Sequence, residues 1–180
     1  HFDLLIVDEA HHLRNSETYS HKAVNLLCEH AEAVVFMTAT PIQLGNNDLY
    51  TLLHMLRPDI VVDKDTFQHM AQPNPHINSA ARHIRSSAEN WNQEALRALW
   101  KAERTEWGRA MLGTNPVFLE ACELLEGEAI TRDERVSLLG KVEGLHTFSR
   151  LINRTRRRDI GDFCVRKPAT VEVQFTGEQR

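Results

Sequence analysis

The 180-residue chain lacks the features that mark membrane-spanning, exported and disulfide-rich proteins. No apolar run approaches the roughly 20 residues that a membrane-spanning helix needs, and no signal peptide opens the chain. Its three cysteines, Cys28, Cys122 and Cys164, are far apart and odd in number, which argues against a disulfide framework and a CxxC metal site. We therefore expect a protein of a reducing cytoplasm that has no membrane partner.

Several catalytic signatures are also missing. The chain has no GxSxG nucleophile elbow. Its ten histidines are scattered, and the adjacent His11 and His12 lack the HExxH spacing of a zinc protease. The phosphate-binding loop GxxxxGK[ST] does not occur, because Gly140-Lys141 has neither the upstream glycine nor the following serine or threonine. These absences argue against serine-hydrolase and zinc-protease chemistry in this chain.

The net charge of −4 is small, but the charge is unevenly distributed. Residues 1–62 carry 3 basic and 8 acidic side chains, whereas residues 150–180 carry 8 basic and 4 acidic ones. The basic excess at the end includes a cluster of Arg154, Arg156, Arg157 and Arg158. Such a run is either a solvated helix face or a surface that faces phosphate, as in nucleotides and nucleic acids.

The first 62 residues alternate in the manner of an α/β fold. Apolar runs predict strands over 3–8 and 33–38, and Ser16 is a candidate cap for a helix that runs to about His30. In that helix Tyr19, Ala23, Val24 and Leu27 share one face. A second helix with apolar positions from Leu49 to Leu56 ends before Pro58. Two strands joined by a helix predict a right-handed parallel crossover.

The later residues predict three further segments. Residues 63–140 lack strand-like runs and form a helical insertion, with helix starts at Asn115-Pro116 and at a Thr131–Glu134 capping box. Residues 141–167 form a helix, striped by apolar residues from Val142 to Ile152, that carries the arginine block. Residues 168–180 contain a half-buried strand over 171–175 and then a helix cap, so we expect a piece of a longer polypeptide.

Two adjacent carboxylates follow the first predicted strand. Asp8 and Glu9 come directly after the apolar run Leu4–Val7, which predicts a buried parallel strand. An Asp at such a strand end can hold magnesium through water, and a Glu beside it can orient or deprotonate an attacking water. His11 is placed to bond to a neighbouring motif or to sense a γ-phosphate, although a loop histidine satisfied by backbone would show the same pattern.

A second motif follows the other predicted strand. Thr38-Ala39-Thr40-Pro41 places two hydroxyls at its carboxyl end, and ligands of open α/β sheets bind outside those ends. Thr38 and Thr40 can bridge the carboxylates to a bound nucleic acid, and Gln43 is a weaker candidate for the same role. A strand-terminating turn with Pro41 as breaker is the alternative.

Together these motifs resemble motifs II and III of superfamily 2 helicases and translocases, and most closely the Swi/Snf-type helicase-like ATPases of the bacterial polymerase-recycling kind. The resemblance is carried by Asp8-Glu9-Ala10-His11-His12-Leu13-Arg14-Asn15, by Thr38-Ala39-Thr40-Pro41-Ile42-Gln43 and by Asn153-Arg154-Thr155-Arg156-Arg157-Arg158-Asp159-Ile160. It implies part of the first RecA-like lobe of a motor that uses ATP and Mg²⁺ to move on duplex DNA, with the arginines facing the cleft or the second lobe.

The resemblance also implies where the protein works and with what. Such a motor would lie in the bacterial cytoplasm, associated with the nucleoid, and would act with RNA polymerase or another protein complex. The 180 residues alone would be inactive, since the phosphate loop is absent. Two other functions stay open: a non-catalytic helical interaction module anchored by Trp91, Trp100 and Trp107, and an RNA helicase. DEAH-box RNA helicases usually have Ser-Ala-Thr in motif III, so Thr38-Ala39-Thr40 favours the translocase.

Overall fold

The structure is a computed structural model that describes residues 1–38, 46–127 and 130–153. Within them the fold is mixed α/β and mostly helical, with one two-stranded parallel sheet near the amino terminus and helices after it. The predicted strand at 171–175, the helix cap after it and the arginine cluster lie outside the described residues. None of the described helices combines the length and the apolar character needed to cross a membrane.

The α/β part begins with strand β1 (Phe2–Val7), the short 3-10 helix η1 (Ala10–Arg14) and helix α1 (Tyr19–Glu29). Strand β2 (Ala31–Phe36) and helix α2 (Asn46–Leu56) complete it. The strands pair in parallel with Leu5 opposite Val34 and Val7 opposite Phe36, which confirms the predicted parallel pairing. The second strand begins and ends two residues earlier than predicted, because α1 already ends at Glu29.

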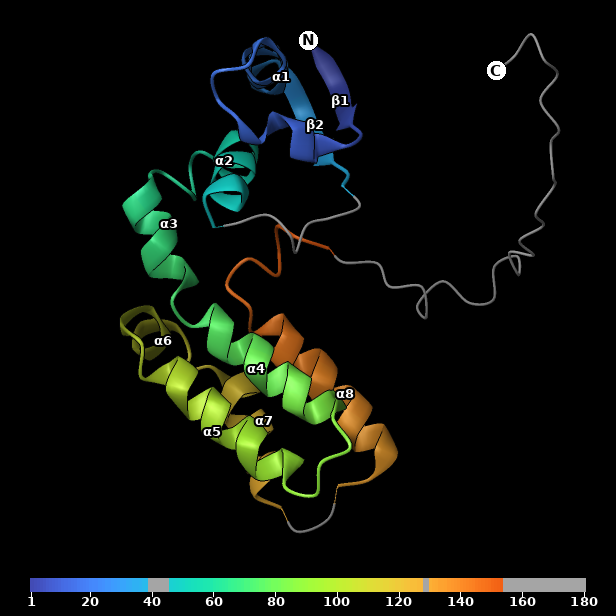
Figure 1. Cartoon of the computed structure of the whole chain (residues 1–180), viewed down its shortest axis with the longest axis vertical. Coiled ribbons are helices and arrows are strands. Elements are labelled where there is room, and N and C mark those ends of the chain that lie inside the picture. The colour runs from blue at the N-terminus through green and yellow to red at the C-terminus, as the bar shows by residue number, and fades with distance from the viewer. Residues whose placement is uncertain (39–45, 128–129, 154–180) are drawn as a thin grey trace, which may run out of the picture.

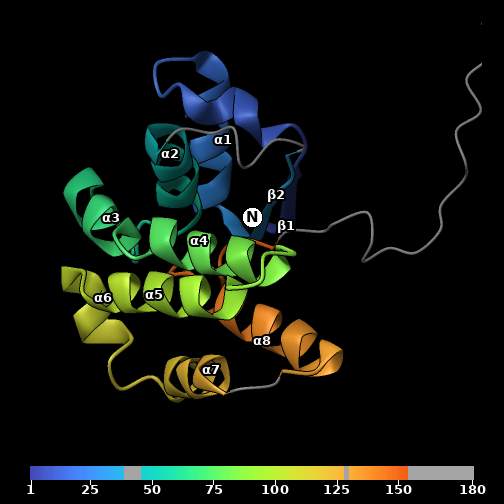
Figure 2. The same ribbon diagram turned by 60° about the horizontal axis from the view of Figure 1, so that its bottom comes forward.

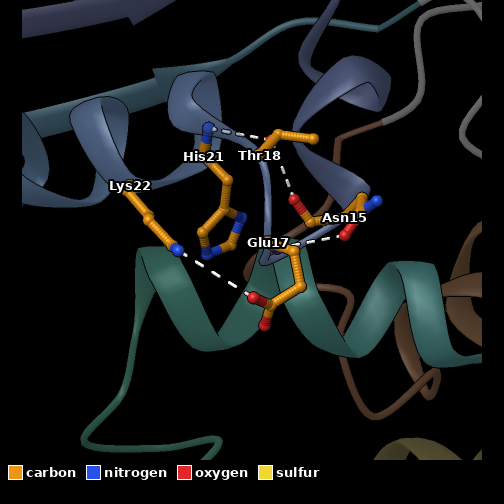
Figure 3. A network of polar contacts seen from close by, with 5 residues as sticks. All are labelled: Asn15, Glu17, Thr18, His21 and Lys22. Atoms are coloured by element: carbon orange, nitrogen blue, oxygen red, sulfur yellow. Dashed lines mark hydrogen bonds and ion pairs between the residues drawn. The ribbon is translucent and has the colours of Figure 1, made fainter.

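The start of α1 corrects the predicted cap. The cap is Thr18 and not Ser16, because Asn15 first closes a turn: its Oδ1 accepts from the Glu17 N–H at 3.0 Å (Figure 3). The Thr18 hydroxyl then accepts from the His21 N–H at 3.2 Å, which is the N-cap bond that starts the helix. The predicted apolar face is also wrong at Tyr19, which is 94% exposed.

One face of the sheet is exposed within the described part of the chain. Phe2, Leu4 and Ile6 on β1 are about half exposed, so the prediction of a buried strand is wrong here. On the other face, Val7 and Phe36 pack with Val24 of α1 around the buried cluster of Leu13, Leu52 and Met55. The sheet therefore has one covered face, and α1 and α2 lie beside it (Figure 1).

The helical part follows a connecting helix, α3 (Lys64–Ala71). It consists of α4 (Asn74–Arg85), α5 (Trp91–Glu103), α6 (Glu106–Met111), α7 (Pro116–Glu126) and α8 (Arg132–Gly144). Helix α4 packs against α5 and α8, and α7 packs against the same two helices, so these four form a bundle (Figure 2). The helix starts predicted at Asn115-Pro116 and at the Thr131–Glu134 capping box are confirmed.

The segment after α8 corrects another prediction. The apolar stripe from Val142 to Ile152 does not lie on one helix, because α8 ends at Gly144 and turns follow. Phe148 in these turns is buried and stacks on Phe67 of α3, with ring centroids 5.1 Å apart. The chain thus returns from the bundle to the base of α2, where Leu53 belongs to the same core cluster.

Candidate active site at the carboxyl ends of the two strands

The two carboxylates lie where β1 ends and the chain turns sharply. The Asp8 carboxylate accepts a hydrogen bond from the Glu9 N–H at 2.8 Å. Glu9 adopts the left-handed conformation, with φ 51° and ψ 41°, and no other non-glycine residue in the described ranges has a positive φ. Such a conformation is uncommon for a residue with a side chain and tends to be found at functional sites. Both carboxylates are exposed to solvent at this turn.

His11 connects the first motif to the second. Its Nδ1 atom lies 3.1 Å from Glu9 Oε2 and 3.4 Å from the hydroxyl oxygen of Thr38. Only about a quarter of the His11 side chain is exposed, compared with half of that of Glu9. The predicted bond between His11 and the second motif is therefore present, and one imidazole nitrogen contacts side chains from the ends of both strands.

Backbone bonds hold the two strand ends together. The Met37 N–H donates to the Val7 carbonyl at 2.8 Å, and the Ala10 N–H donates back to the Met37 carbonyl at 2.9 Å. The parallel ladder therefore continues past both strands and ends beside Thr38. The geometry of the site depends on this ladder, since the carboxylates themselves are exposed.

The short helix η1 is anchored on α2. Leu13 is buried against Leu52 and Met55, and Arg14 approaches Asp48 with 4.0 Å between Nη1 and Oδ2. The sequence alone predicted no chemical role for Arg14 or Asp48. An Asp in the first turn of the helix after the second motif is the signal that could have found this contact. His12 is exposed, and its ring lies 4.2 Å from that of His11.

The turn after η1 contains a polar network that the sequence did not reveal. His21 Nδ1 lies 2.7 Å from the Leu13 carbonyl oxygen, which ties α1 to the end of η1. Lys22 and Glu17 approach each other to 3.9 Å across the same turn (Figure 3). The Asn15 side chain shapes this turn by accepting from the Glu17 N–H. The remaining predicted site residues, Thr40, Gln43, Arg154, Arg156, Arg157 and Arg158, lie outside the described residues.

Comparison with known proteins places the chain in a family. A family model described as the SNF2-related domain matches residues 1–105. The RNA polymerase-associated protein RapA of Vibrio atlanticus is 28% identical over 99% of this chain, which covers 18% of that relative. RapA of Yersinia enterocolitica is 29% identical over 90% of the chain and 16% of its own length.

One shorter segment of the chain has a higher identity to a relative. RapA of Photobacterium profundum is 45% identical over 69 residues, which are 37% of this chain and 7% of that protein. The chain thus spans less than a fifth of the length of the curated relatives that it matches. No solved structure matches the chain significantly.

Proposed function

The chain belongs to the SNF2-related domain family, and we propose that it forms part of the first RecA-like lobe of an ATP-driven motor that moves on duplex DNA. The observation that carries this proposal is the contact of His11 with both Glu9 and Thr38, from the ends of two adjacent parallel strands. Ligands of open α/β sheets bind outside such strand ends. The activity proposed is that of the full-length protein, since the chain spans less than a fifth of its relatives.

The donor groups at the strand end fit magnesium. Mg²⁺ prefers carboxylate oxygens and water, and Asp8 presents an exposed carboxylate at the turn after β1. In this proposal Asp8 would hold the ion through water, and a bound ion would supply positive charge beside the nucleotide phosphates. Glu9 would orient or deprotonate the attacking water, while its Oε2 atom contacts His11.

The second motif would transmit the state of the nucleotide site to DNA. Thr38 contacts His11, so a change at Glu9 reaches Thr38 through one side chain. We propose that Thr38 and Thr40 couple ATP hydrolysis to movement on DNA, with Gln43 as a further polar bridge. Arg154, Arg156, Arg157 and Arg158 would face the nucleotide, the nucleic acid or the second RecA-like lobe of the same polypeptide.

The sequence similarity also supports a place and a partner. The relatives are named as RNA polymerase-associated, and we propose that the full-length protein contacts RNA polymerase or another protein complex on the bacterial nucleoid. The 180 residues contain no GxxxxGK[ST] loop. We therefore expect the chain alone to have no ATP hydrolysis activity.

The test is Glu9→Gln in the full-length protein, with DNA-stimulated ATP hydrolysis as the measurement. Loss of a positioned base lowers turnover by about 10²- to 10⁴-fold, and ATP binding should persist. Glu17→Gln is the matched control, because Glu17 is an exposed acidic residue of the following turn whose ion-pair distance to Lys22 is 3.9 Å. Near-normal turnover of the Glu9 variant would remove Glu9 from the catalytic role.

The helical interaction module stays a second candidate, because the four-helix bundle has a core of its own. Trp91 and Trp107 pack against core clusters, whereas Trp100 is 39% exposed and could anchor a partner. A GxxxxGK[ST] motif upstream in the parent polypeptide would favour the motor, and its absence would favour the module. Stimulation of the full-length ATPase by RNA and not by duplex DNA would indicate an RNA helicase.

A further inference from the structure

A hollow lies between α1 and α2, and none of the motif residues described above lines it. Its walls come from the turn before α1 and from the facing sides of the two helices. The lining residues are Ser16, His21, Asn25, Tyr50, Thr51, His54 and Met55. A neighbouring hollow shares Asn25, His54 and Met55 with it. Figure 3 shows the His21 ring suspended from α1 above α2.

Two histidines from different helices line this hollow, and the same ring nitrogen of each is bonded to a backbone carbonyl. His21 Nδ1 lies 2.7 Å from the Leu13 carbonyl oxygen, and His54 Nδ1 lies 2.6 Å from the Val61 carbonyl oxygen. A carbonyl oxygen only accepts, so each Nδ1 carries the hydrogen. In the neutral imidazole Nε2 is then the acceptor, with its lone pair available for a ligand.

This arrangement has the chemistry of a metal ligand. A histidine that binds a metal almost always donates its other ring N–H to a carbonyl or carboxylate, which fixes the ring and raises its basicity. The backbone carbonyls of Leu13 and Val61 provide that fixation for both histidines. Neutral imidazole nitrogens favour zinc, copper and nickel over magnesium or calcium.

We propose that His21 and His54 bind one divalent transition-metal ion of the zinc class through their Nε2 atoms, between α1 and α2. No group of three or more histidine, cysteine or acidic side chains able to hold a metal occurs in the described ranges, so the proposed site has two protein ligands and water would supply the others. The ion would clamp α1, which has no fully buried residue, onto α2. Its binding therefore stabilises the part of the chain that carries the carboxylate site.

The test titrates ZnCl₂ into the 180-residue chain and follows heat of binding and the melting temperature, with MgCl₂ as the comparison salt. One zinc ion per chain should bind and raise the melting temperature, and a chelator should reverse the rise. His21→Asn and His54→Asn are the informative variants, because an asparagine amide can still donate to the carbonyl but has no group in place of Nε2. Each should weaken zinc binding more than tenfold.

His30→Asn provides a matched control. His30 Nδ1 also lies close to a backbone carbonyl oxygen, that of Leu26 at 2.8 Å, but the residue lies outside the hollow. Its variant should bind zinc like the wild type. The proposal is overturned if the folded wild type binds no zinc at about 1 mM, or if the doubly substituted chain binds zinc as tightly as the wild type. Metal-free melting curves of each variant establish that it is folded.

Discussion

The four-helix bundle and the α/β part differ in how completely they bury their own apolar side chains. The bundle encloses one cluster contributed by all four of its helices, including Leu99, Phe118 and Leu138, each fully buried. In the α/β part the cluster under the sheet has three buried members, and α1 contributes none of them. Phe2, Leu4 and Ile6 remain about half exposed on the open face of the sheet.

This difference shows what positions the candidate site. The bundle is held by packing, whereas the site is held by a backbone ladder at two strand ends and by the anchored side chain of Leu13. The left-handed Glu9 lies between these two supports. Substitutions in the bundle should therefore change stability most, and substitutions around η1 should change the site with a smaller effect on stability.

Phe118→Ala should give the largest loss of stability. Phe118 is fully buried in the bundle and meets Trp100 edge to face, so its removal leaves a cavity and costs about 3–5 kcal/mol in the free energy of unfolding. Urea denaturation measures the loss. Leu119→Ala on the same helix is the control, since Leu119 is 49% exposed and should change stability by about 0.5 kcal/mol or less. Equal losses in the two variants would contradict the packing of α7 described above.

Leu13→Ala should have a smaller effect on stability and a larger one on the site. Leu13 is 4% exposed and packs on Leu52 and Met55, so its truncation costs about 2–3 kcal/mol, in the lower part of the range for buried leucines. Amide hydrogen exchange should rise in η1 and at the end of β1 while the bundle stays protected. Leu26→Ala on α1 is the control, because Leu26 is 58% exposed. Unchanged exchange in η1 would show that the backbone ladder alone holds the turn.

The sequence predicted the elements whose signals are local. The parallel strand pair follows from two short apolar runs, and the caps at Asn115 and Thr131 follow from residue type and spacing. The contact between His11 and Thr38 was also predicted, because the carboxyl ends of adjacent parallel strands lie at one edge of a sheet. In each case a few neighbouring residues or one pairing rule determine the geometry.

The errors arose where a contact distant in the sequence, or a competing local turn, decides the structure. The apolar stripe after Val142 predicted one helix, but Phe148 turns back to stack on Phe67, which is far away in the sequence. The start of α1 depends on a turn closed by Asn15, which competes with the cap expected at Ser16. Periodicity and spacing contain neither kind of information.

Arg135→Met should weaken the bundle where α8 meets the connection between α4 and α5. The Arg135 guanidinium donates to the carbonyls of Ile84 and Ser86 and lies 4.0 Å above the Trp91 ring, so it joins α8 to the α4–α5 connection. Loss of these contacts, with similar side-chain length kept, should cost about 1–2 kcal/mol because the site is partly solvated. Urea denaturation measures the cost, and Arg132→Met at the exposed start of α8 is the control. An equal cost in both variants would exclude a specific role for Arg135.

The smallest expected effect is a pH dependence at the junction between the bundle and the α/β part. Burial lowers the pKa of the His146 imidazole, and its Nδ1 accepts the Phe148 N–H at 3.3 Å, a bond that a proton on Nδ1 would remove. The unfolded chain therefore takes up a proton more readily than the folded one, and this site's contribution to stability decreases as pH falls through the ordinary histidine pKa of about 6.5.

Hydrogen bonds from the Thr66 and Thr131 N–H groups lower the pKa values of Asp63 and Glu134, so the stability from these carboxylates is lost only at lower pH, below about 4.5.

Urea midpoints between about pH 7.5 and pH 5.5 therefore separate His146 from those carboxylates. In His146→Gln the midpoint should change less over this interval than in the wild type, and His30→Gln should keep the wild-type dependence because His30 is exposed at the end of α1. If the His146 variant and the wild type share the same pH dependence, protonation elsewhere controls the stability of the chain. The junction would then be held mainly by the stacking of buried Phe148 on Phe67.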